Sequence, residues 1–254
     1  MTNNILEINN LSKNFGGLKA TDDITFNVKK GERFGILGPN GAGKTTIFNL
    51  ISGFIKPDNG KIIFQNESIF GMNPIKIAHK GLVRTFQIVK PFKELSVFEN
   101  LKVASLTPRM NKLFPNESEK IDWIKHVASI CELEEVLYTD TEQLPQGYLK
   151  KLEVAKALTV KPELILLDEP FAGLTSSEIE PISNVIIKAN EKSGTTIILI
   201  EHRLKEFMQI VNRIIAIDYG KKIAEGTPKE IVENKQVIES YLGKGGGEIA
   251  NAWY

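Results

Sequence analysis

A glycine-rich segment near residue 40 has the composition of a phosphate-binding loop. Residues 38–45 match the pattern Gly-x-x-x-x-Gly-Lys-Thr. Glycines let backbone N–H groups curl around a phosphate, and a following helix points its unpaired N–H groups at the same anion. In such a loop Lys44 would bridge the β- and γ-phosphates, and the Thr45 hydroxyl would bind Mg²⁺. The predicted nucleotide-binding residues are Gly38, Pro39, Asn40, Gly41, Ala42, Gly43, Lys44, Thr45 and Thr46.

Two carboxylates follow an apolar run much later in the chain. Leu164–Leu167 has the composition of a buried strand, and Asp168 and Glu169 come directly after it. Strands of open α/β sheets deliver ligand-binding residues at their carboxyl ends. Asp168 would hold Mg²⁺, through water, and Glu169 would polarise a water molecule for attack on the γ-phosphate. The competing interpretation, a simple helix cap, loses weight because the phosphate-loop pattern is present.

A third strand-like run, 196–200, ends in Glu201 and His202. His202 stands 34 residues after Asp168. Taken alone, a histidine here would be a structural one. If its strand lies in the same sheet, His202 would reach the same edge and contact the γ-phosphate.

The elements that must position these residues alternate along the chain. The alternating runs 5–8 and 24–28 predict short strands, and 33–37 predicts a strand that leads into the phosphate loop and a helix from residue 44 to 51. Between about 91 and 160 the apolar residues recur at helical spacing instead. Strands are then expected at 164–167, 195–200 and 214–217, with helices near 176–192 and 203–211. This alternation predicts an α/β fold with a largely parallel sheet and a helical insert.

Composition excludes several classes of protein. The chain has 254 residues, of which 42% are hydrophobic and 25% charged, so it is neither mostly disordered, nor collagen-like, nor a coiled-coil rod. The chain has 32 Lys and Arg residues and 31 Asp and Glu residues, so its formal net charge is +1. This near-neutral charge argues against a dedicated nucleic-acid coat protein. Residues 1–90 hold 12 basic and 6 acidic residues, a net +6, so an anion site in this part competes with a merely solvated face.

Cysteine usage and hydropathy bear on the compartment. Cys131 is the single cysteine, so no internal disulfide can form, and it has no metal-ligand spacing with the three histidines. We interpret it as a small core residue in a reducing compartment. No apolar run approaches the ~20 residues of a spanning helix, and the first residues do not read as a signal peptide. By itself the chain is expected to be soluble and cytoplasmic.

Five motifs, in order, resemble those of ATP-binding subunits of ABC transporters, over essentially the whole chain. They are the phosphate loop 38–45, Gln87 within Arg84-Thr85-Phe86-Gln87, the run Leu144-Pro145-Gln146-Gly147-Tyr148, the pair Asp168-Glu169, and His202. The resemblance is closest to the LivG-type ATPases of high-affinity branched-chain amino acid importers. It rests on residues 83–87, 169–174, 200–204 and 219–228.

The resemblance implies an ABC ATPase fold. Such a fold has a phosphate-loop NTPase core, an N-terminal antiparallel β-subdomain and an inserted α-helical subdomain. It implies a single domain over residues 1–243, with the core in 1–90 and 161–243, the helical insert at about 91–160, and a flexible tail at 244–254.

The resemblance also assigns roles to further residues. Phe15 matches the aromatic residue that stacks on adenine, although an ordinary core Phe is the alternative. Gln87 matches the glutamine that senses Mg²⁺ and the γ-phosphate, and it begins the segment that links the core to the insert. Gly147 would bind the nucleotide of a partner subunit in trans. The implied cofactors are ATP and Mg²⁺, with Gln87, Thr45 and Asp168 at the metal and Glu169, His202 and Gln87 in catalysis.

The signature segment departs from the family pattern Leu-Ser-Gly-Gly-Gln. Pro145, Gln146 and Tyr148 replace the serine, the first glycine and the glutamine. The serine hydroxyl is therefore absent, although the Gly147 backbone and a helix N-terminus remain available to an anion. Thr175 likewise replaces a common Asp after Glu169. A partner ATPase with a standard signature could compensate, so both a homodimer and a heterodimer stay open.

The implied partners are membrane subunits and a binding protein. Permease subunits would contact the helical insert and the Gln87 segment, and a periplasmic or extracellular binding protein would act indirectly, which places the chain on the cytoplasmic face of the cell membrane. Related systems that import urea or amides or export lipopolysaccharide remain alternatives, as does a soluble non-transport ABC ATPase. The insert is acidic and lacks sustained heptads, which disfavours nucleic acid. A GTPase would need an Asn-Lys-x-Asp motif, but residues 234–237 end in Val.

Overall fold

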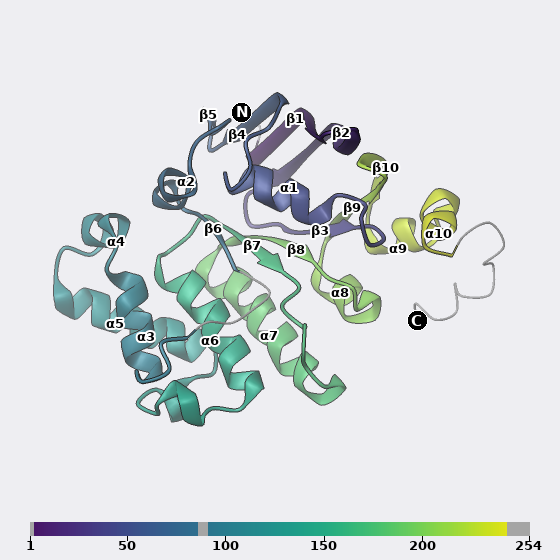
Figure 1. The fold of residues 1–254 in the computed structure, drawn as a ribbon. Coiled ribbons are helices and arrows are strands. Elements are labelled where there is room, and N and C mark those ends of the chain that lie inside the picture. The colour runs from purple at the N-terminus through teal and green to yellow at the C-terminus, as the bar shows by residue number, and fades with distance from the viewer. Residues whose placement is uncertain (1–2, 86–90, 243–254) are drawn as a thin grey trace. The chain divides into compact units, whose positions relative to one another are not determined.

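The computed structural model describes residues 3–85 and 91–242, which divide into two compact units (Figure 1). One unit contains residues 3–77 and 196–242, and the other contains 78–195 without 86–90. The second unit therefore includes the expected helical insert together with the segments that flank it. The expected tail at 244–254 lies outside the described residues. The described elements follow the strand–helix alternation expected from the sequence.

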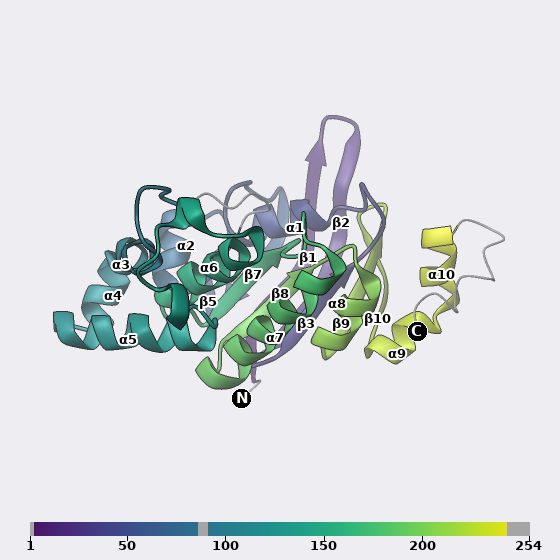
Figure 2. The same ribbon diagram turned by 90° about the horizontal axis from the view of Figure 1, so that it is seen from below.

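An antiparallel sheet of four strands, in the order β2-β1-β4-β5, forms one layer of the first unit. The strands expected at 5–8 and 24–28 are confirmed, but they extend to 12 residues each and form a long hairpin, which projects in Figure 2. Asn10 and Asp23 lie at an irregularity within the hairpin: both adopt positive φ where the register shifts, and their side chains are hydrogen-bonded at 2.6 Å. The strands are β1 (Asn4–Phe15), β2 (Leu18–Lys29), β4 (Asn59–Phe64) and β5 (Glu67–Ser68).

The parallel strands of the first unit follow the expected alternation. β3 pairs in parallel with β8 and β9, and β10 closes the edge antiparallel to β9. In Figure 1 the helix α1 lies between this layer and the antiparallel sheet. The strands are β3 (Arg33–Leu37), β8 (Thr196–Ile200), β9 (Arg213–Asp218) and β10 (Lys221–Gly226), and the helices are α1 (Lys44–Ile51), α8 (Leu204–Ile210), α9 (Pro228–Val232) and α10 (Lys235–Leu242).

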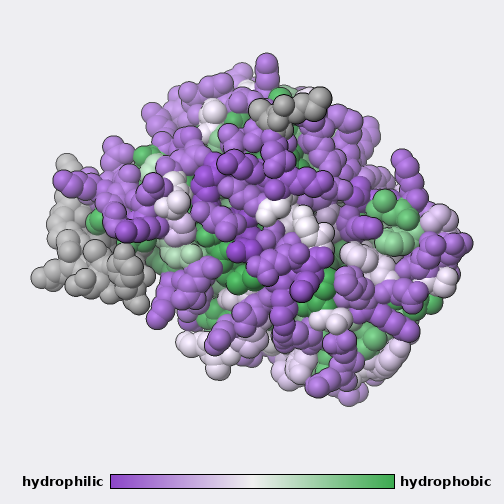
Figure 3. Space-filling model, turned by 180° about the vertical axis from the view of Figure 1, so that it is seen from behind, coloured by the Kyte–Doolittle hydropathy of each residue, from purple (hydrophilic) through white to green (hydrophobic). Residues whose placement is uncertain are grey.

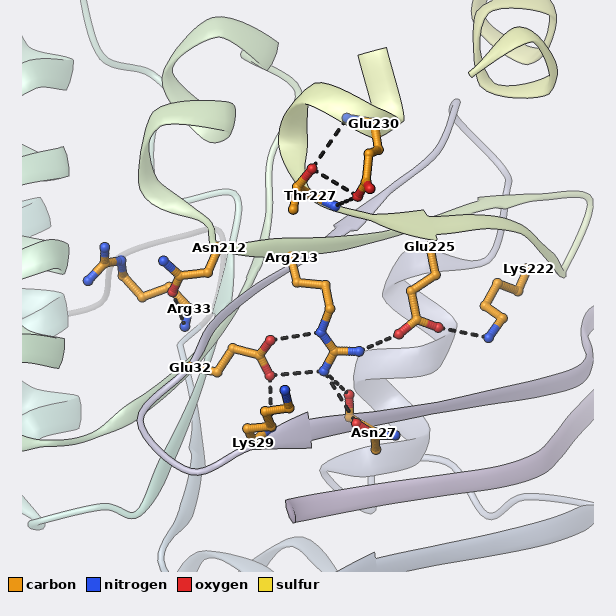
Figure 4. A network of polar contacts seen from close by, with 10 residues as sticks. All are labelled: Asn27, Lys29, Glu32, Arg33, Asn212, Arg213, Lys222, Glu225, Thr227 and Glu230. Carbon is orange, nitrogen blue, oxygen red and sulfur yellow. Dashed lines mark hydrogen bonds and ion pairs between the residues drawn. The ribbon is translucent and has the colours of Figure 1, made fainter. Parts of the chain in front are cut away.

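A polar network joins the two layers of the first unit around Arg213 (Figure 4). The guanidinium donates to both carboxylate oxygens of Glu32, at 2.8 and 3.0 Å, to the carbonyl of Asn27, and to Glu225. Its planar face also lies 4.8 Å from the ring centre of Phe34. Such a fork of charge-assisted bonds fixes β9 against the loop before β3 and the end of β2.

The described part of the second unit combines two parallel strands with five α-helices, α3 to α7. Arg84 of β6 is in register with Leu166 of β7, and α6 contacts α3, α5 and α7. The elements are β6 (Leu82–Arg84), α3 (Val97–Ser105), α4 (Pro108–Leu113), α5 (Glu117–Ile130), the 3₁₀ turns η1 (Glu134–Val136) and η2 (Thr141–Gln143), α6 (Gln146–Thr159), β7 (Leu164–Asp168) and α7 (Ser176–Ser193); α2 (Pro74–Lys80) crosses the boundary between the units.

Burial and surface polarity agree with the composition. Cys131 is fully buried, which confirms its interpretation as a core residue, and burial raises the pKa of its thiol. Hydrophilic side chains cover most of the described surface in Figure 3, and hydrophobic ones form small separate groups. Among the described residues, the helices are all too short or too polar to cross a membrane.

Candidate functional site

The predicted phosphate loop connects β3 to α1 in the first unit. Helix α1 begins at Lys44, directly after Gly43, which has a φ of +105°. A Cβ atom at Gly43 would lie 2.3 Å from the carbonyl oxygen of Ala20, and one at Gly38 would lie 2.3 Å from that of Ile217. Only glycine fits these two positions, and its missing side chain lets the loop lie close to β2 and β9.

The ammonium group of Lys44 is hydrogen-bonded to the backbone of the loop itself. Its side chain is buried, and its Nζ donates to the carbonyl oxygens of Gly38 and Pro39 at 2.7 and 2.9 Å. The amide of Gly220, in the turn between β9 and β10, donates to the carbonyl of Ala42 at 3.0 Å. Thr45 is exposed in the first turn of α1. A fixed loop, a buried ammonium and a helix N-terminus together form a site for a polyphosphate.

His202 emerges from the sheet at the same end as the loop. Ile36 of β3 pairs with Ile200 of β8, and Gly38 and His202 each follow two residues later. His202 is exposed to solvent. The buried carboxylate of Glu201 accepts a hydrogen bond from the His202 amide at 2.9 Å, which fixes the backbone just beyond the strand. This register supports the predicted place of His202 beside the phosphate loop.

Phe15 ends β1 at the tip of the long hairpin. It is 46% exposed, so the alternative interpretation of an ordinary core Phe is wrong. The Nζ of Lys13 lies 5.6 Å from the centre of its ring. Leu18 pairs with Phe15, and Ala20, two residues further on, is the residue that touches Gly43. An exposed aromatic face on the hairpin that borders the loop fits the expected contact with a base.

Asp168 and Glu169 lie in the second unit, at the end of β7. Asp168 is buried, and its Oδ2 lies 2.7 Å from Nη2 of Arg84, which ends the neighbouring strand β6. Glu169 is partly exposed and has a φ of +51°, a left-handed conformation that costs a non-glycine residue about 1 kcal/mol or more. Strained backbone of this kind is concentrated at functional sites. Because of this conformation, the backbone leaves the direction of β7 at Glu169, whereas Asp168 still belongs to the strand.

The variant signature segment begins α6. Pro145 is the N-cap residue and Gln146 the first residue of the helix, as expected for a proline near a helix start. The Gly147 amide lies against the carboxylate of Glu178 on α7, whose Oε1 would be 3.6 Å from a Cβ at Gly147. The amide and hydroxyl of Thr175 also donate to Glu178, and these bonds lower the pKa of its carboxyl. Thr175 is the N-cap residue of α7, and its hydroxyl donates to Glu178, which an ionised aspartate at this position could not do.

The structure brings the predicted residues together in two groups. The loop and His202 share one end of the first unit's parallel sheet, and Asp168 and Glu169 end β7 in the second unit. Gln87 lies outside the described residues. Among the residues that the structure describes, no group of three or more His, Cys, Asp or Glu side chains is placed so that it could hold a metal ion.

Sequence reasoning missed two residues that contact these groups. The sequence predicted Arg84 only as part of a motif. A charged residue at the end of the short strand 82–84 is a signal for a buried ion pair. Tyr241, in α10, accepts a hydrogen bond from the Gly38 amide at 2.8 Å. Its 203-residue separation from Gly38 left no local pattern that could have revealed the contact.

Comparison with protein families identifies two matching segments. Residues 21–172 match the profile of the family described as ABC transporter, and residues 221–246 match that of the branched-chain amino acid ATP-binding cassette transporter. The first segment covers the phosphate loop, Gln87, the signature and the Asp168-Glu169 pair. The second covers β10, α9 and α10.

Similar proteins extend over the whole length. The high-affinity branched-chain amino acid transport ATP-binding protein BraF of Pseudomonas aeruginosa is 37% identical, over 96% of this chain and all of that protein. LivG of Escherichia coli K12 is 36% identical with the same coverage. The ADP conformation of MJ1267, an ATP-binding cassette of an ABC transporter, superposes with a TM-score of 0.84 at 34% identity, over 95% of this chain and 99% of that one.

Proposed function

This chain belongs to the ABC transporter ATP-binding proteins, in the LivG/BraF family, and we propose that it drives the import of branched-chain amino acids. As a member of that family it is an ATPase. The observation that carries the proposal is the loop 38–45, shaped by two glycines that have no room for a side chain, in a chain whose C-terminal segment matches the branched-chain amino acid family. We infer that the chain hydrolyses ATP and passes the resulting motion to membrane subunits.

The loop would bind the phosphates of ATP mainly through its backbone. Backbone amides of the loop and of the first turn of α1 would bind the phosphates, and Lys44 would exchange the carbonyls of Gly38 and Pro39 for the β- and γ-phosphates. Phe15 would stack on adenine.

The carboxylates would serve metal binding and proton transfer. Thr45 and Asp168 would hold Mg²⁺, which neutralises charge on the β- and γ-phosphates, and Gln87 would complete the metal's surroundings. Glu169 would accept a proton from the water that attacks the γ-phosphorus, while the bond from that phosphorus to the ADP oxygen breaks. His202 would donate a hydrogen bond to the γ-phosphate. Arg84 holds Asp168 in place at 2.7 Å, so Mg²⁺ would share or displace that contact.

Two ATPase subunits would enclose the nucleotides. The structure of the ATP-binding cassette MJ0796, described as dimeric and bound to ADP and Pi, is similar to this chain with a TM-score of 0.73 at 25% identity, over 88% of this chain. In such a dimer the Gly147 amide and the N-terminus of α6 would face the γ-phosphate bound by the partner subunit. Closure with ATP and opening after hydrolysis would move the helical insert and the Gln87 segment. These parts would contact permease subunits at the cytoplasmic face of the membrane, with a binding protein delivering the cargo.

The test is transport by a reconstituted complex. We would co-express the chain with the permease and binding-protein genes that neighbour its own gene, isolate membranes and measure ATP-dependent uptake of leucine, isoleucine and valine into vesicles. The expected result is co-fractionation with the permease and uptake that the K44A variant abolishes. A chain that stays out of the membrane fraction with every neighbouring permease would overturn the transport role. Uptake of urea or amides instead would overturn the cargo alone.

A further inference from the structure

We infer that Tyr241 is a positioning residue for the phosphate loop, through which the C-terminal helix α10 tightens nucleotide binding. The inference rests on the proposed binding of ATP at residues 38–45. It assigns a role to a part of the chain that the general ABC transporter profile, over residues 21–172, does not include.

The contact joins the first residue of the loop to the last full turn of the described chain. The Gly38 amide donates to the Tyr241 hydroxyl at 2.8 Å. Gly38 is buried, so its amide is shielded from water and gains the most from a fixed partner. Burial raises the pKa of Tyr241, and the hydrogen bond from the Gly38 amide opposes part of that shift.

Tyr241 adds a hydrogen bond at the start of the loop, where Lys44 also bonds the Gly38 carbonyl and Gly38 lies close to the Ile217 carbonyl. The Ala42 carbonyl is held by the Gly220 amide at 3.0 Å, and Gly43 packs against the Ala20 carbonyl. These contacts act on the middle and the end of the loop. The Tyr241 hydroxyl binds the amide of Gly38, where the chain leaves β3, and so contributes with these contacts to the path of the loop backbone. Amides that must converge on one phosphate depend on that path.

Helix α10 is held in place by its own contacts with the rest of the first unit. Val237, one helical turn before Tyr241, is fully buried, and the side chain of Asn234 accepts bonds from the amides of Gln236 and Val237 at the start of the helix. Helix α10 also contacts α9 and β10. All of these elements lie within residues 221–246, which match the branched-chain amino acid family. The hydrogen bond thus couples a family-specific segment to the phosphate loop.

The coupling must act in both directions. If docking of α10 favours the nucleotide-binding shape of the loop, then bound nucleotide must favour the docked helix by the same free energy. Nucleotide should therefore slow amide hydrogen exchange in residues 235–242, although this helix contains none of the residues proposed to bind ATP.

The experiment compares Tyr241→Phe with a matched control, Tyr138→Phe, in the full chain. Both changes remove one hydroxyl, but Tyr138 is exposed and lies in the other unit. Affinities for ADP and ATP are measured by displacement of a fluorescent nucleotide. We expect Y241F to bind both about three- to tenfold more weakly, the loss typical of one hydrogen bond. Its kcat at saturating ATP should stay close to that of the unchanged protein, and Y138F should bind normally.

Hydrogen exchange supplies a test that does not depend on a variant. In the unchanged protein, ADP with Mg²⁺ is expected to slow exchange in residues 235–242 at least twofold. The inference would be overturned if folded Y241F bound nucleotide as tightly as the unchanged protein does. It would also be overturned if nucleotide did not change the rate of hydrogen exchange in α10. Failure of the proposed function would look different, because the unchanged protein would then bind ADP and ATP no better than K44A does.

Discussion

Nη2 of Arg84 lies 2.7 Å from Oδ2 of Asp168, and the two side chains are only 6% and 9% exposed. An ion pair removed from water in this way is held by its geometry, because neither charge can be solvated alone. The pair sits where two parallel strands end together, β6 and β7, and it therefore fixes the carboxylate that the proposed mechanism assigns to Mg²⁺.

Removing Arg84 should destabilise the second unit. We expect R84A to lower the free energy of unfolding by about 3 kcal/mol, because the Asp168 carboxylate would stay buried without its counter-charge. Urea denaturation measures this change. In a double-mutant cycle with D168N, the combined variant should lose much less than the sum of the two single changes. Additive losses would show that the two groups are not coupled.

Replacing Glu169 by glutamine should separate ATP binding from hydrolysis. E169Q keeps the shape of the side chain but cannot take a proton, so hydrolysis should fall on the order of 100-fold or more. ATP should still bind, and sedimentation should show a dimer that persists with ATP, since a carboxylate next to the γ-phosphate has been neutralised. The control is E180Q, the same change at an exposed position of α7. Loss of ATP affinity, or a monomer in ATP, would contradict the assignment.

Two glycines of the phosphate loop should respond differently to the same substitution. Both Gly41 and Gly43 have positive φ, at +80° and +105°, but a Cβ at Gly41 meets nothing within 4 Å, whereas one at Gly43 lies 2.3 Å from the Ala20 carbonyl. We expect G41A to cost about 1 kcal/mol of stability, from backbone strain. G43A should cost about 2 kcal/mol more, because the loop must also move away from β2. Thermal unfolding measures both, and equal costs would refute the close contact.

The network around Arg213 should be sensitive to shape as well as to charge. R213A removes the bonds to both oxygens of Glu32 and the contact with Phe34, and should lower the free energy of unfolding by about 3 kcal/mol. R213K keeps the positive charge but loses the planar fork, so it should recover only part of that loss. Chemical denaturation distinguishes the two variants. Full stability of R213K would mean that charge alone matters.

Local patterns in the sequence predicted much of the fold. The spacing of apolar residues predicted the positions of β3, β7, β8 and α1, because the apolar face of a strand or helix is set by residues that are close together in the sequence. The lengths of β1 and β2 were underestimated. Their pairing continues beyond the register shift at Asn10 and Asp23, and such pairing between two strands is not visible in the apolar pattern of either one.

The sequence by itself determined which chemical groups this chain has and in what order. The loop glycines, Lys44 and the Asp168-Glu169 pair are recognisable because a phosphate site needs those residue types at short, fixed spacing. Only the tertiary structure decided what holds those groups in place: Arg84 on Asp168, Glu178 against Gly147, and Tyr241 on Gly38. Each of these contacts joins residues at least 31 positions apart. Such pairs meet only when separate elements pack together, so their partners cannot be read from the spacing of residues along the chain.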